Sequence, residues 1–296
     1  MKTVLYADWN RPDMPRMNPV RVAFLTSIRD VGKDDLNGST VPTKEGPKYM
    51  EGSLERFLIE TLSGGRLYGY AELVAVITDD IGGRDLTEEG YPALPQIGRQ
   101  WIHPHTLRTG NGTCVTDMTR NIPSLFRALP KDAIEERKRE KLRFEKAVLA
   151  AMREAGAEIL ISDHFMARID YLVGELGLYG KVLNIHPAIT LPEHEFAFPG
   201  KTPTADAIAR ARMLHGDIFT GATLHVMNRE IDKGPPLALI AGTPVHADDE
   251  PQWLRYRNYQ MSKLRILIRG FRHYVERILP YIDSIDLSSL VPKKEG

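Results

Sequence analysis

The stretch of sequence that decides the fold runs from Lys181 to Pro187 and reads Lys-Val-Leu-Asn-Ile-His-Pro. This apolar run predicts a buried strand, and Pro187 ends it because proline has no backbone N–H for a sheet ladder. Side chains alternate along a strand, so Asn184 and His186, two positions apart, point to the same face. An amide and an imidazole are therefore presented together at the end of the strand, where open α/β sheets bind ligands.

Further apolar runs lie on both sides of this stretch. The runs predicted as strands are Val22–Thr26, Leu73–Thr78, Ile159–Ser162, Ala222–Met227 and Leu237–Ile240, and the last two are expected to pair. The segments predicted as helices are Ser53–Leu62, Lys131–Glu154 and Ala205–Leu214. Strands that alternate with helices predict an α/β fold, with a Rossmann-like, open and mostly parallel sheet and flanking helices.

A last helix is predicted near the carboxyl end of the chain. Apolar residues recur there at alternating spacings of three and four, at Met261, Leu264, Ile268, Phe271, Val275 and Ile278. The arginines around this stripe are Arg265, Arg269, Arg272 and Arg277. We expect the helix to pack its apolar stripe on the core and to turn a basic face outward, and a membrane-surface or RNA-binding helix is the alternative. Residues 27–48 are predicted as a long loop, and residues 80–130 as loops with short elements.

The composition is that of an ordinary globular protein. The 296 residues are 42% hydrophobic and 26% charged with a formal net charge of +0, which gives no hint of a nucleic-acid or anionic-membrane partner. No break in composition requires a second folding unit. The expected organisation is an N-terminal arm over residues 1–20, a catalytic domain over residues 21–250, and a C-terminal helix and tail over residues 251–296 that pack on the same domain.

Cysteine content and the lack of targeting segments indicate the compartment. Cys114 is the single cysteine, so no intramolecular disulfide can form, as is usual in a reducing cytosol. No apolar run approaches the roughly 18 residues that span a bilayer, and the amino terminus does not have the pattern of a signal peptide. We therefore expect a cytoplasmic protein that has no membrane partner.

A third candidate for chemistry is Asp232, in the turn Ile231–Pro235 that directly follows the strand Ala222–Met227. Taken alone, Asp232 would be interpreted as an ordinary turn aspartate. In the same way, His186 alone would be interpreted as a structural histidine that forms hydrogen bonds. Other candidates are weaker. His103, His105 and Cys114 have neither a fourth ligand nor compact spacing, so no metal is expected. The turn at residues 110–113 does not have the full dinucleotide-binding fingerprint.

The motifs taken together, in their order, resemble the folate-dependent formyltransferase family. They are Ile161–Met166, Asn184–Pro187, Phe198–Gly200, Thr220–His225 and Ile231–Pro235, and the resemblance runs from about Ala157 to Pro244. It implies the formyltransferase version of the Rossmann-like fold, and 10-formyltetrahydrofolate as the cosubstrate without a metal. The catalytic asparagine, histidine and aspartate of the family match Asn184, His186 and Asp232.

In such an enzyme an amine-type nitrogen attacks the formyl carbon, and a tetrahedral intermediate forms with negative charge on oxygen. The resemblance implies that Asn184 donates a hydrogen bond to that oxygen. His186 would stabilise the intermediate and move protons, and Asp232 would hold the imidazole or a water and accept a proton. How the proton transfers divide between His186 and Asp232 is left open by the sequence.

The resemblance also implies a pterin pocket made mainly of backbone groups from two loops. The matching residues are Phe165, Met166, Ala167, Arg168 and Ile169 in one loop, and Arg229, Glu230, Ile231 and Asp232 in the other. Two departures from the family pattern affect this site. Ala167 is inserted in the usual Phe-Met-Arg-Ile, and the segment Leu191–Ala197 is longer than the usual link to Pro-Gly.

The acceptor is indicated by the segment after the first strand, Ser27–Gly32. It is not the glycine-rich phosphate loop of glycinamide ribonucleotide formyltransferases, and it looks like the corresponding segment of the hydroxyornithine formyltransferases of siderophore assembly. Their acceptor needs a cation for its carboxylate and an acid for its α-amine, which Arg29, Asp30, Asp34 and Asp35 could supply. A sugar-nucleotide amine is the alternative acceptor, and a non-catalytic folate-binding protein is the alternative from another class.

Overall fold

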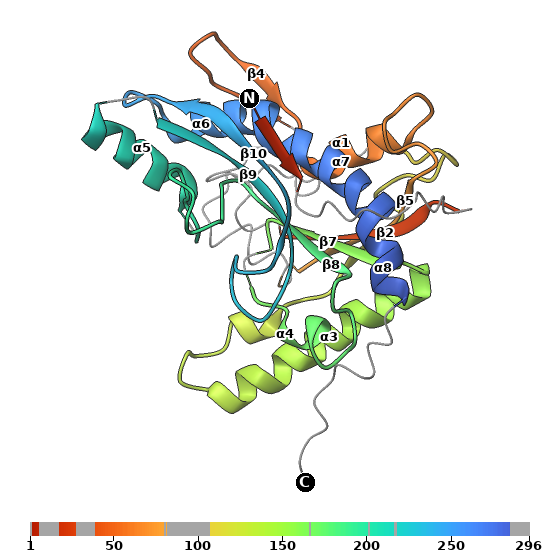
Figure 1. Cartoon of the computed structure of the whole chain (residues 1–296). Helices are drawn as coiled ribbons and strands as arrows, with labels where there is room; N and C mark the ends of the chain where they lie inside the picture. The colour runs from red at the N-terminus through yellow and green to blue at the C-terminus, as the bar shows by residue number, and fades with distance from the viewer. Residues whose placement is uncertain are drawn as a thin grey trace.

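The computed structural model describes residues 2–5, 18–27, 39–79, 81, 107–165, 167–200, 202–215 and 218–284. The strands of its central sheet are β1 (Lys2–Leu5), β2 (Val20–Thr26), β5 (Ala71–Thr78), β6 (Thr119–Asn121), β7 (Ile159–Asp163), β8 (Val182–His186), β9 (Ile218–Val226) and β10 (Pro236–Val245). They form one eight-stranded sheet in the order β1-β10-β9-β8-β7-β2-β5-β6 (Figure 1).

The sheet has a parallel part and an antiparallel edge. β8, β7, β2, β5 and β6 pair in parallel, whereas β9, β10 and β1 add to this set by antiparallel pairing. The predicted Rossmann-like, mostly parallel sheet is confirmed, and so is the pairing of the last two predicted strands. The long apolar runs explain β2 and β7, whose side chains are buried on both faces apart from Arg21.

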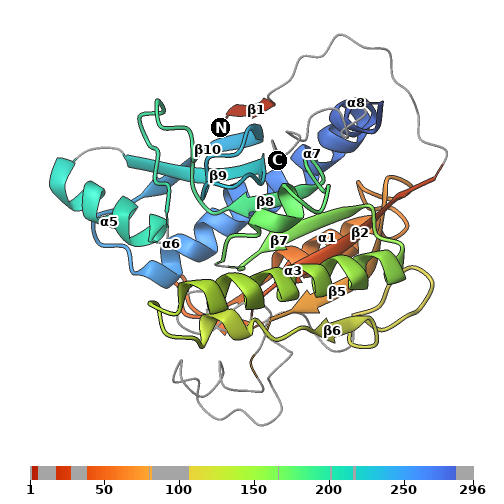
Figure 2. The same cartoon turned by 90° about the horizontal axis from the view of Figure 1, so that it is seen from below.

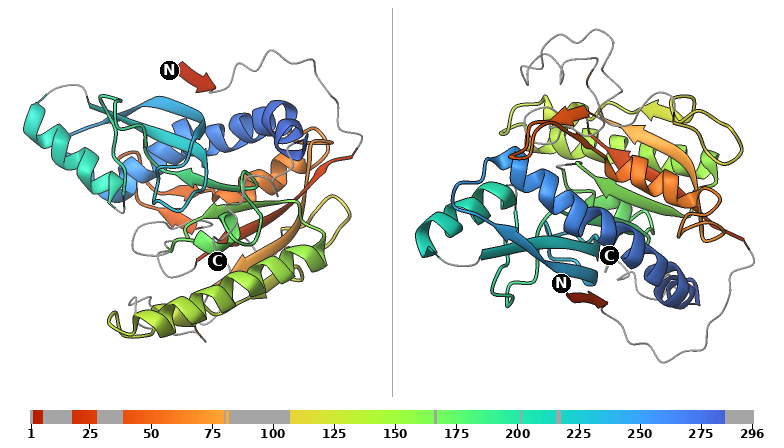
Figure 3. Two further views of the ribbon diagram at one scale, coloured as in Figure 1. Left: turned by 60° about the horizontal axis from the view of Figure 1, so that its bottom comes forward. Right: turned by 90° about the horizontal axis from the view of Figure 1, so that it is seen from above.

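Helices cover both faces of the sheet, so the molecule has three layers (Figures 2 and 3). One face is covered by α1 (Ser53–Thr61) and α7 (Leu264–His273), and its core joins Phe24, Phe57 and Phe271. The other face is covered by α3 (Ile134–Ala155), whose Phe144 and Val148 meet Leu25 and Leu160 of the strands. The short helix α4 (Asp170–Val173) packs on the same side as α3.

The C-terminal helix is one long rod with two π-helical turns. It consists of α6 (Pro251–Asn258), η2 (Tyr259–Lys263), α7, η3 (Tyr274–Ile278) and α8 (Leu279–Ser284). Its predicted stripe is buried from Leu264 to Ile278, and Arg265, Arg269 and Arg272 are exposed, so the predicted packing on the core is confirmed. Among the described residues, no helix has the length and apolar character that crossing a membrane requires.

The structure differs from the sequence-based expectation at three places. The predicted loop at residues 27–48 contains β3 (Ser39–Val41), which pairs with β4 (Lys48–Met50) in a hairpin. Part of the expected N-terminal arm is β1, which extends the sheet at β10. The helix α4 follows the predicted cofactor loop. All three are short, so their sequences carry little periodicity. In addition, β1 pairs with β10, which lies far away in the sequence.

Candidate active site

Strand β8 supplies the first two site residues. Leu183 and Ile185 of β8 are buried in the core on the α7 face, so the alternation of the strand places Asn184 and His186 on the opposite face. His186 is 6% exposed and Asn184 is half-buried. The predicted common face of the amide and the imidazole is therefore present.

Asp232 reaches these residues because its turn folds back beside β8. β9 is antiparallel to β8 and pairs Val226 with Leu183, so β9 ends beside the start of β8 rather than beside His186. The turn after β9 lies tightly against that strand: a Cβ on Gly234 would lie 1.6 Å from the Val226 carbonyl oxygen. Asp232 has φ +55°, a left-handed conformation that aspartate tolerates better than most residues.

His186 and Asp232 form a close pair. The Nδ1 atom of His186 lies 3.4 Å from Oδ1 of Asp232, and its Nε2 atom lies 3.3 Å from the Phe198 carbonyl oxygen. A carbonyl oxygen only accepts, so Nε2 carries a hydrogen, and because the Asp232 carboxylate also only accepts, a second hydrogen is needed between Nδ1 and Asp232 for the two to pair. Burial lowers the pKa of His186, although Asp232 acts in the opposite direction. The backbone N–H of Gly200 donates to the other oxygen of Asp232, at 3.2 Å.

The amide of Asn184 is oriented by His225 of β9. Nδ1 of His225 lies 3.1 Å from the Val226 carbonyl oxygen, so it carries the hydrogen and leaves Nε2 as an acceptor. The Asn184 amide donates to that Nε2 at 3.0 Å. Burial lowers the pKa of His225 to about 4, which keeps the ring neutral. The amide has a second N–H, so Asn184 can donate to a ligand while His225 fixes its orientation.

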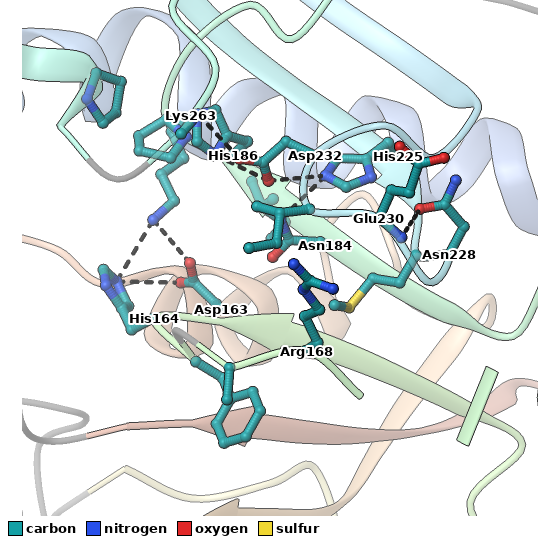
Figure 4. Close-up of a pocket in the computed structure, with 18 of the residues that line it drawn as sticks. Asp163, His164, Arg168, Asn184, His186, His225, Asn228, Glu230, Asp232 and Lys263 are labelled. Carbon is teal, nitrogen blue, oxygen red and sulfur yellow. Dashed lines mark hydrogen bonds and ion pairs between the residues drawn. The ribbon is translucent and has the colours of Figure 1, made fainter. Parts of the chain in front are cut away.

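These residues line one cavity of about 340 Å³ (Figure 4). The predicted site residues that line it are Phe165, Ala167, Arg168, Asn184, His186, Glu230, Ile231 and Asp232. The two predicted pterin loops therefore meet at the three predicted catalytic residues. Ile231 has a side chain that is 47% exposed, an apolar surface that a flat ring could cover.

Several predicted site residues pack on other parts of the chain, and one of them, Phe165, also lines the cavity. Phe165 stacks its ring on Phe144 of α3, with ring centroids 5.6 Å apart, and Ile169 is fully buried in the same core. The Arg229 guanidinium lies over Gly174, where an added Cβ would be 2.6 Å from it. Met166 and the predicted acceptor residues Arg29, Asp30, Asp34 and Asp35 lie outside the described residues.

The predicted site residues did not include a second group of cavity residues, at the end of β7 and in η2, although two of these residues belong to the motif Ile161–Met166. Asp163, His164 and Lys263 line the cavity, and Lys263 is only 1% exposed. For the C-terminal helix, the sequence predicted only an apolar stripe and a basic outer face. The π-helical turn η2 changes which positions face inward, and Lys263 lies in that turn. His225 belongs to the motif Thr220–His225. Its contact with Asn184 depends on the register between β8 and β9, which cannot be derived from the sequence alone. Within the described part of the chain, no cluster of histidine, cysteine, aspartate and glutamate has the geometry of a metal site.

Comparison with protein families gives one match that covers more than half of the chain. The sequence profile of the family described as formyl transferase matches residues 115–269. A phosphoribosylglycinamide formyltransferase of Mycobacterium tuberculosis is 36% identical over 125 residues, which are 41% of this chain and 51% of that protein. A formyltetrahydrofolate deformylase of Corynebacterium sp. is 36% identical over 99 residues, 33% of this chain and 30% of that protein. The chain thus spans about half or less of the length of these curated relatives.

Solved structures share the fold. PvdF of pyoverdin biosynthesis, described as an N10-formyltetrahydrofolate-dependent formyltransferase, has a TM-score of 0.75 and 25% identity. That likeness covers 88% of this chain and 100% of PvdF. Glycinamide ribonucleotide transformylase 1 from Symbiobacterium toebii has a TM-score of 0.53 and 18% identity, covering 88% of this chain and 90% of that one, and shows a shared fold alone.

Proposed function

The chain belongs to the formyl transferase family, and from this premise we propose that it transfers the formyl group of 10-formyltetrahydrofolate to the side-chain hydroxylamine of hydroxyornithine. The observation that carries the transfer reaction is the convergence of Asn184, His186 and Asp232 in one cavity. The folate cosubstrate is supported by the description of PvdF, which names it. The cytoplasmic location remains a proposal that rests on the single cysteine, Cys114.

The geometry fits each role in the reaction. The acceptor nitrogen attacks the formyl carbon, and the free N–H of Asn184 donates to the oxygen that becomes negative. The proton lost by the acceptor nitrogen goes to the couple of His186 Nδ1 and Asp232, either directly or through a water. The same couple returns a proton to the folate nitrogen as its bond to the formyl carbon breaks. Atoms and charges balance, because one N–H is exchanged for one N–formyl bond.

The residues around the cavity also fit a pterin. Ala167, Met227 and Ile231 offer an apolar wall, and the loops on either side offer backbone donors and acceptors at its edge. When bound there, the folate supplies the activated formyl group. Arg168 and Glu230 also line the cavity (Figure 4), and Glu230 pairs there with Lys233 at 2.6 Å.

The choice of hydroxylamine as acceptor is supported by the likeness to PvdF and by proton chemistry. An alkyl amine with a pKa near 10.4 is almost wholly protonated at pH 7 and then has no lone pair for attack. A hydroxylamine nitrogen is largely neutral at that pH. A neutral acceptor nitrogen can attack at once, whereas an ammonium must first lose a proton to a base such as His186 or Asp232.

The test is a competition assay with 10-formyltetrahydrofolate and an equal mixture of hydroxyornithine, ornithine, lysine, an amino-sugar nucleotide and phosphoribosylglycinamide. Formylated hydroxyornithine should dominate the products. The matched control is Asn184→Ala, which should lower turnover by roughly 100-fold or more, because one oxyanion donor is lost.

Formylation of another acceptor in place of hydroxyornithine would contradict the proposed acceptor. It would still support the proposed formyl transfer reaction. Release of formate without any formylated acceptor would favour a hydrolase like the deformylase relative. Folate binding without turnover of any kind would mark a non-catalytic binding protein.

A further inference from the structure

The long link between β8 and the Pro-Gly motif is a feature that formyl transfer alone does not explain. We call residues 191–200 the link segment. Its turns fold the chain back, and the N–H of Phe198 donates to the Ile189 carbonyl at 2.9 Å, which closes a loop at the end of β8. Phe198 is 6% exposed and lies in one buried cluster with Ala207. The extra length is therefore folded against the end of the strand that carries His186.

The end of the link segment contacts both members of the catalytic pair. The Phe198 carbonyl accepts from Nε2 of His186 at 3.3 Å, and the N–H of Gly200 donates to Oδ2 of Asp232 at 3.2 Å. Both contacts are made on the outer atoms of the pair, so Nδ1 of His186 and Oδ1 of Asp232 face each other, 3.4 Å apart. Two backbone groups of one short segment thus set the orientation of the imidazole and of the carboxylate.

Arg210 of α5 (Pro203–Leu214) holds the link segment from the outside. Its guanidinium donates to the Glu195 carbonyl at 2.7 Å. The Cζ atom of Arg210 also lies 5.9 Å from the ring centroids of both Phe196 and Phe198, within the range of a cation–π contact. All three contacts fall on the few residues that precede the carbonyl bonded to the catalytic imidazole. Arg210 is half-buried and is not one of the residues that line the cavity, so it can act only through the link segment.

A second arginine on the same helix shows what such a contact looks like away from the site. Nε of Arg212 donates to the Ala247 carbonyl at 2.9 Å, and neither residue lines the cavity. Arg210 and Arg212 therefore make the same kind of arginine–carbonyl contact from one helix. Only the contact of Arg210 leads to the His186–Asp232 pair.

We propose that Arg210 is a positioning residue for the transfer reaction, which holds the link segment so that the Phe198 carbonyl and the Gly200 N–H keep His186 and Asp232 facing each other. Because Nε2 is occupied by the Phe198 carbonyl, Nδ1 stays the ring nitrogen that exchanges protons in the reaction. The inference rests on the proposed function for the identity of the reaction, but the orientation of the imidazole can be measured without an acceptor.

The kinetic test uses Arg210→Met, which keeps the aliphatic part of the side chain and removes the guanidinium. We expect kcat to fall by roughly 10-fold or more, because a catalytic group that is misplaced by about 1 Å can cost roughly 100-fold. The KM values for folate and acceptor should change little, since Arg210 does not line the cavity. Arg210→Lys should recover part of kcat, because an ammonium can still donate to the Glu195 carbonyl. Arg212→Met is the matched control and should keep the kcat of the unmodified chain.

The second readout is the exchange of the Nε2–H of His186 with water, followed by NMR, with His186→Gln to assign the signal. Exchange should be faster in Arg210→Met than in the unmodified chain and unchanged in Arg212→Met. Normal kcat in Arg210→Met would overturn the proposal, as would an equal loss in Arg212→Met or a loss of kcat without faster exchange. If the unmodified chain formylates no acceptor, the proposed function fails, whereas faster exchange in Arg210→Met alone would still support the positioning role of Arg210.

Discussion

Asp232 combines a charge with a backbone conformation that few residues adopt. Its φ of +55° is tolerated by aspartate and asparagine, whose short polar side chains can bond locally, and resisted by residues such as alanine. The structure needs both properties, because the turn must fold back beside β8 and the carboxylate must then face Nδ1 of His186 at 3.4 Å. A substitution that removes the charge of Asp232 but accepts the same backbone conformation therefore separates the two properties.

Asp232→Asn is expected to keep the fold of the turn and to remove the proton acceptor. We expect kcat to fall by roughly 100-fold or more, the size of a lost acid–base group. The thermal midpoint should stay close to that of the unmodified chain, because asparagine accepts the same backbone conformation. Turnover with 10-formyltetrahydrofolate and thermal unfolding measure the two effects. A variant with normal kcat would remove Asp232 from proton transfer, and a strongly destabilised one would give it a structural role instead.

At the scale of elements, the turn after β9 is held by close packing as well as by hydrogen bonds. Gly234→Ala would place a Cβ 1.6 Å from the Val226 carbonyl oxygen, so the turn must shift and carry Asp232 with it. Because misplacing a catalytic group by about 1 Å can cost roughly 100-fold, we expect a loss of that order in kcat. Gly110→Ala is the control, since its Cβ would meet its nearest neighbour, Leu62, at 3.9 Å. Equal activity of the two variants would contradict this view of the turn.

Helix α3 contacts α4, the helix that follows the predicted cofactor loop, through Glu145. This carboxylate is fully buried and accepts from the backbone N–H of Leu172 at the start of α4, 2.7 Å away. Burial raises its pKa to about 7. A raised folded-state pKa gives stability that is present in full below the unfolded value of 4.5 and is lost as the pH rises through about 7.

Glu145→Gln should therefore stabilise the protein above pH 7 and have little effect near pH 5. The gain at pH 8 is expected to approach about 3 kcal/mol, since each pKa unit corresponds to about 1.4 kcal/mol. Denaturant midpoints at both pH values measure it. Glu136→Gln, at an exposed position of the same helix, is the control and should change stability little at either pH. A destabilised Glu145→Gln at pH 8 would show that the charged form is the one that supports α4.

The long elements and the catalytic pair on β8 were predictable from the sequence for different reasons. Apolar runs and the stripe from Leu264 to Ile278 are local signals, and they predicted the terminal helix and the parallel strands β2, β5, β7 and β8, but not the short strand β6. Asn184 and His186 share a face because they lie two apart on one strand. The partners of these residues are not local: His225 meets Asn184 through strand register, and Lys263 meets Asp163 across about a hundred residues of sequence. Such contacts depend on tertiary packing, which periodicity does not encode.

At the scale of the whole molecule, the C-terminal rod belongs to the same core as the sheet. Phe271 of α7 packs edge-on against Phe57 of α1 with ring centroids 5.2 Å apart, and Phe57 packs in the same way against Phe24 of β2, also at 5.2 Å. The same rod carries Lys263 into the cavity. We propose that residues 21–284 form one folding unit, in which packing on the α7 face fixes where the ammonium of Lys263 lies.

Phe271→Ala tests this unity. Phe271 is fully buried, so its truncation should cost about 3–5 kcal/mol from lost burial and the cavity left behind. The fluorescence of Trp253 on α6 is isolated by placing the variants in a Trp9→Phe/Trp101→Phe background. If the rod and the sheet unfold together, this fluorescence and far-UV circular dichroism should report one transition, and its midpoint should fall equally by both probes. Met213→Ala, at a side chain that is 77% exposed on α5 (Pro203–Leu214), should leave that midpoint nearly unchanged. A fluorescence transition that moves while the circular dichroism transition stays would mean that the rod unfolds separately. The position of Lys263 would then depend on docking of the rod rather than on the stability of the whole fold.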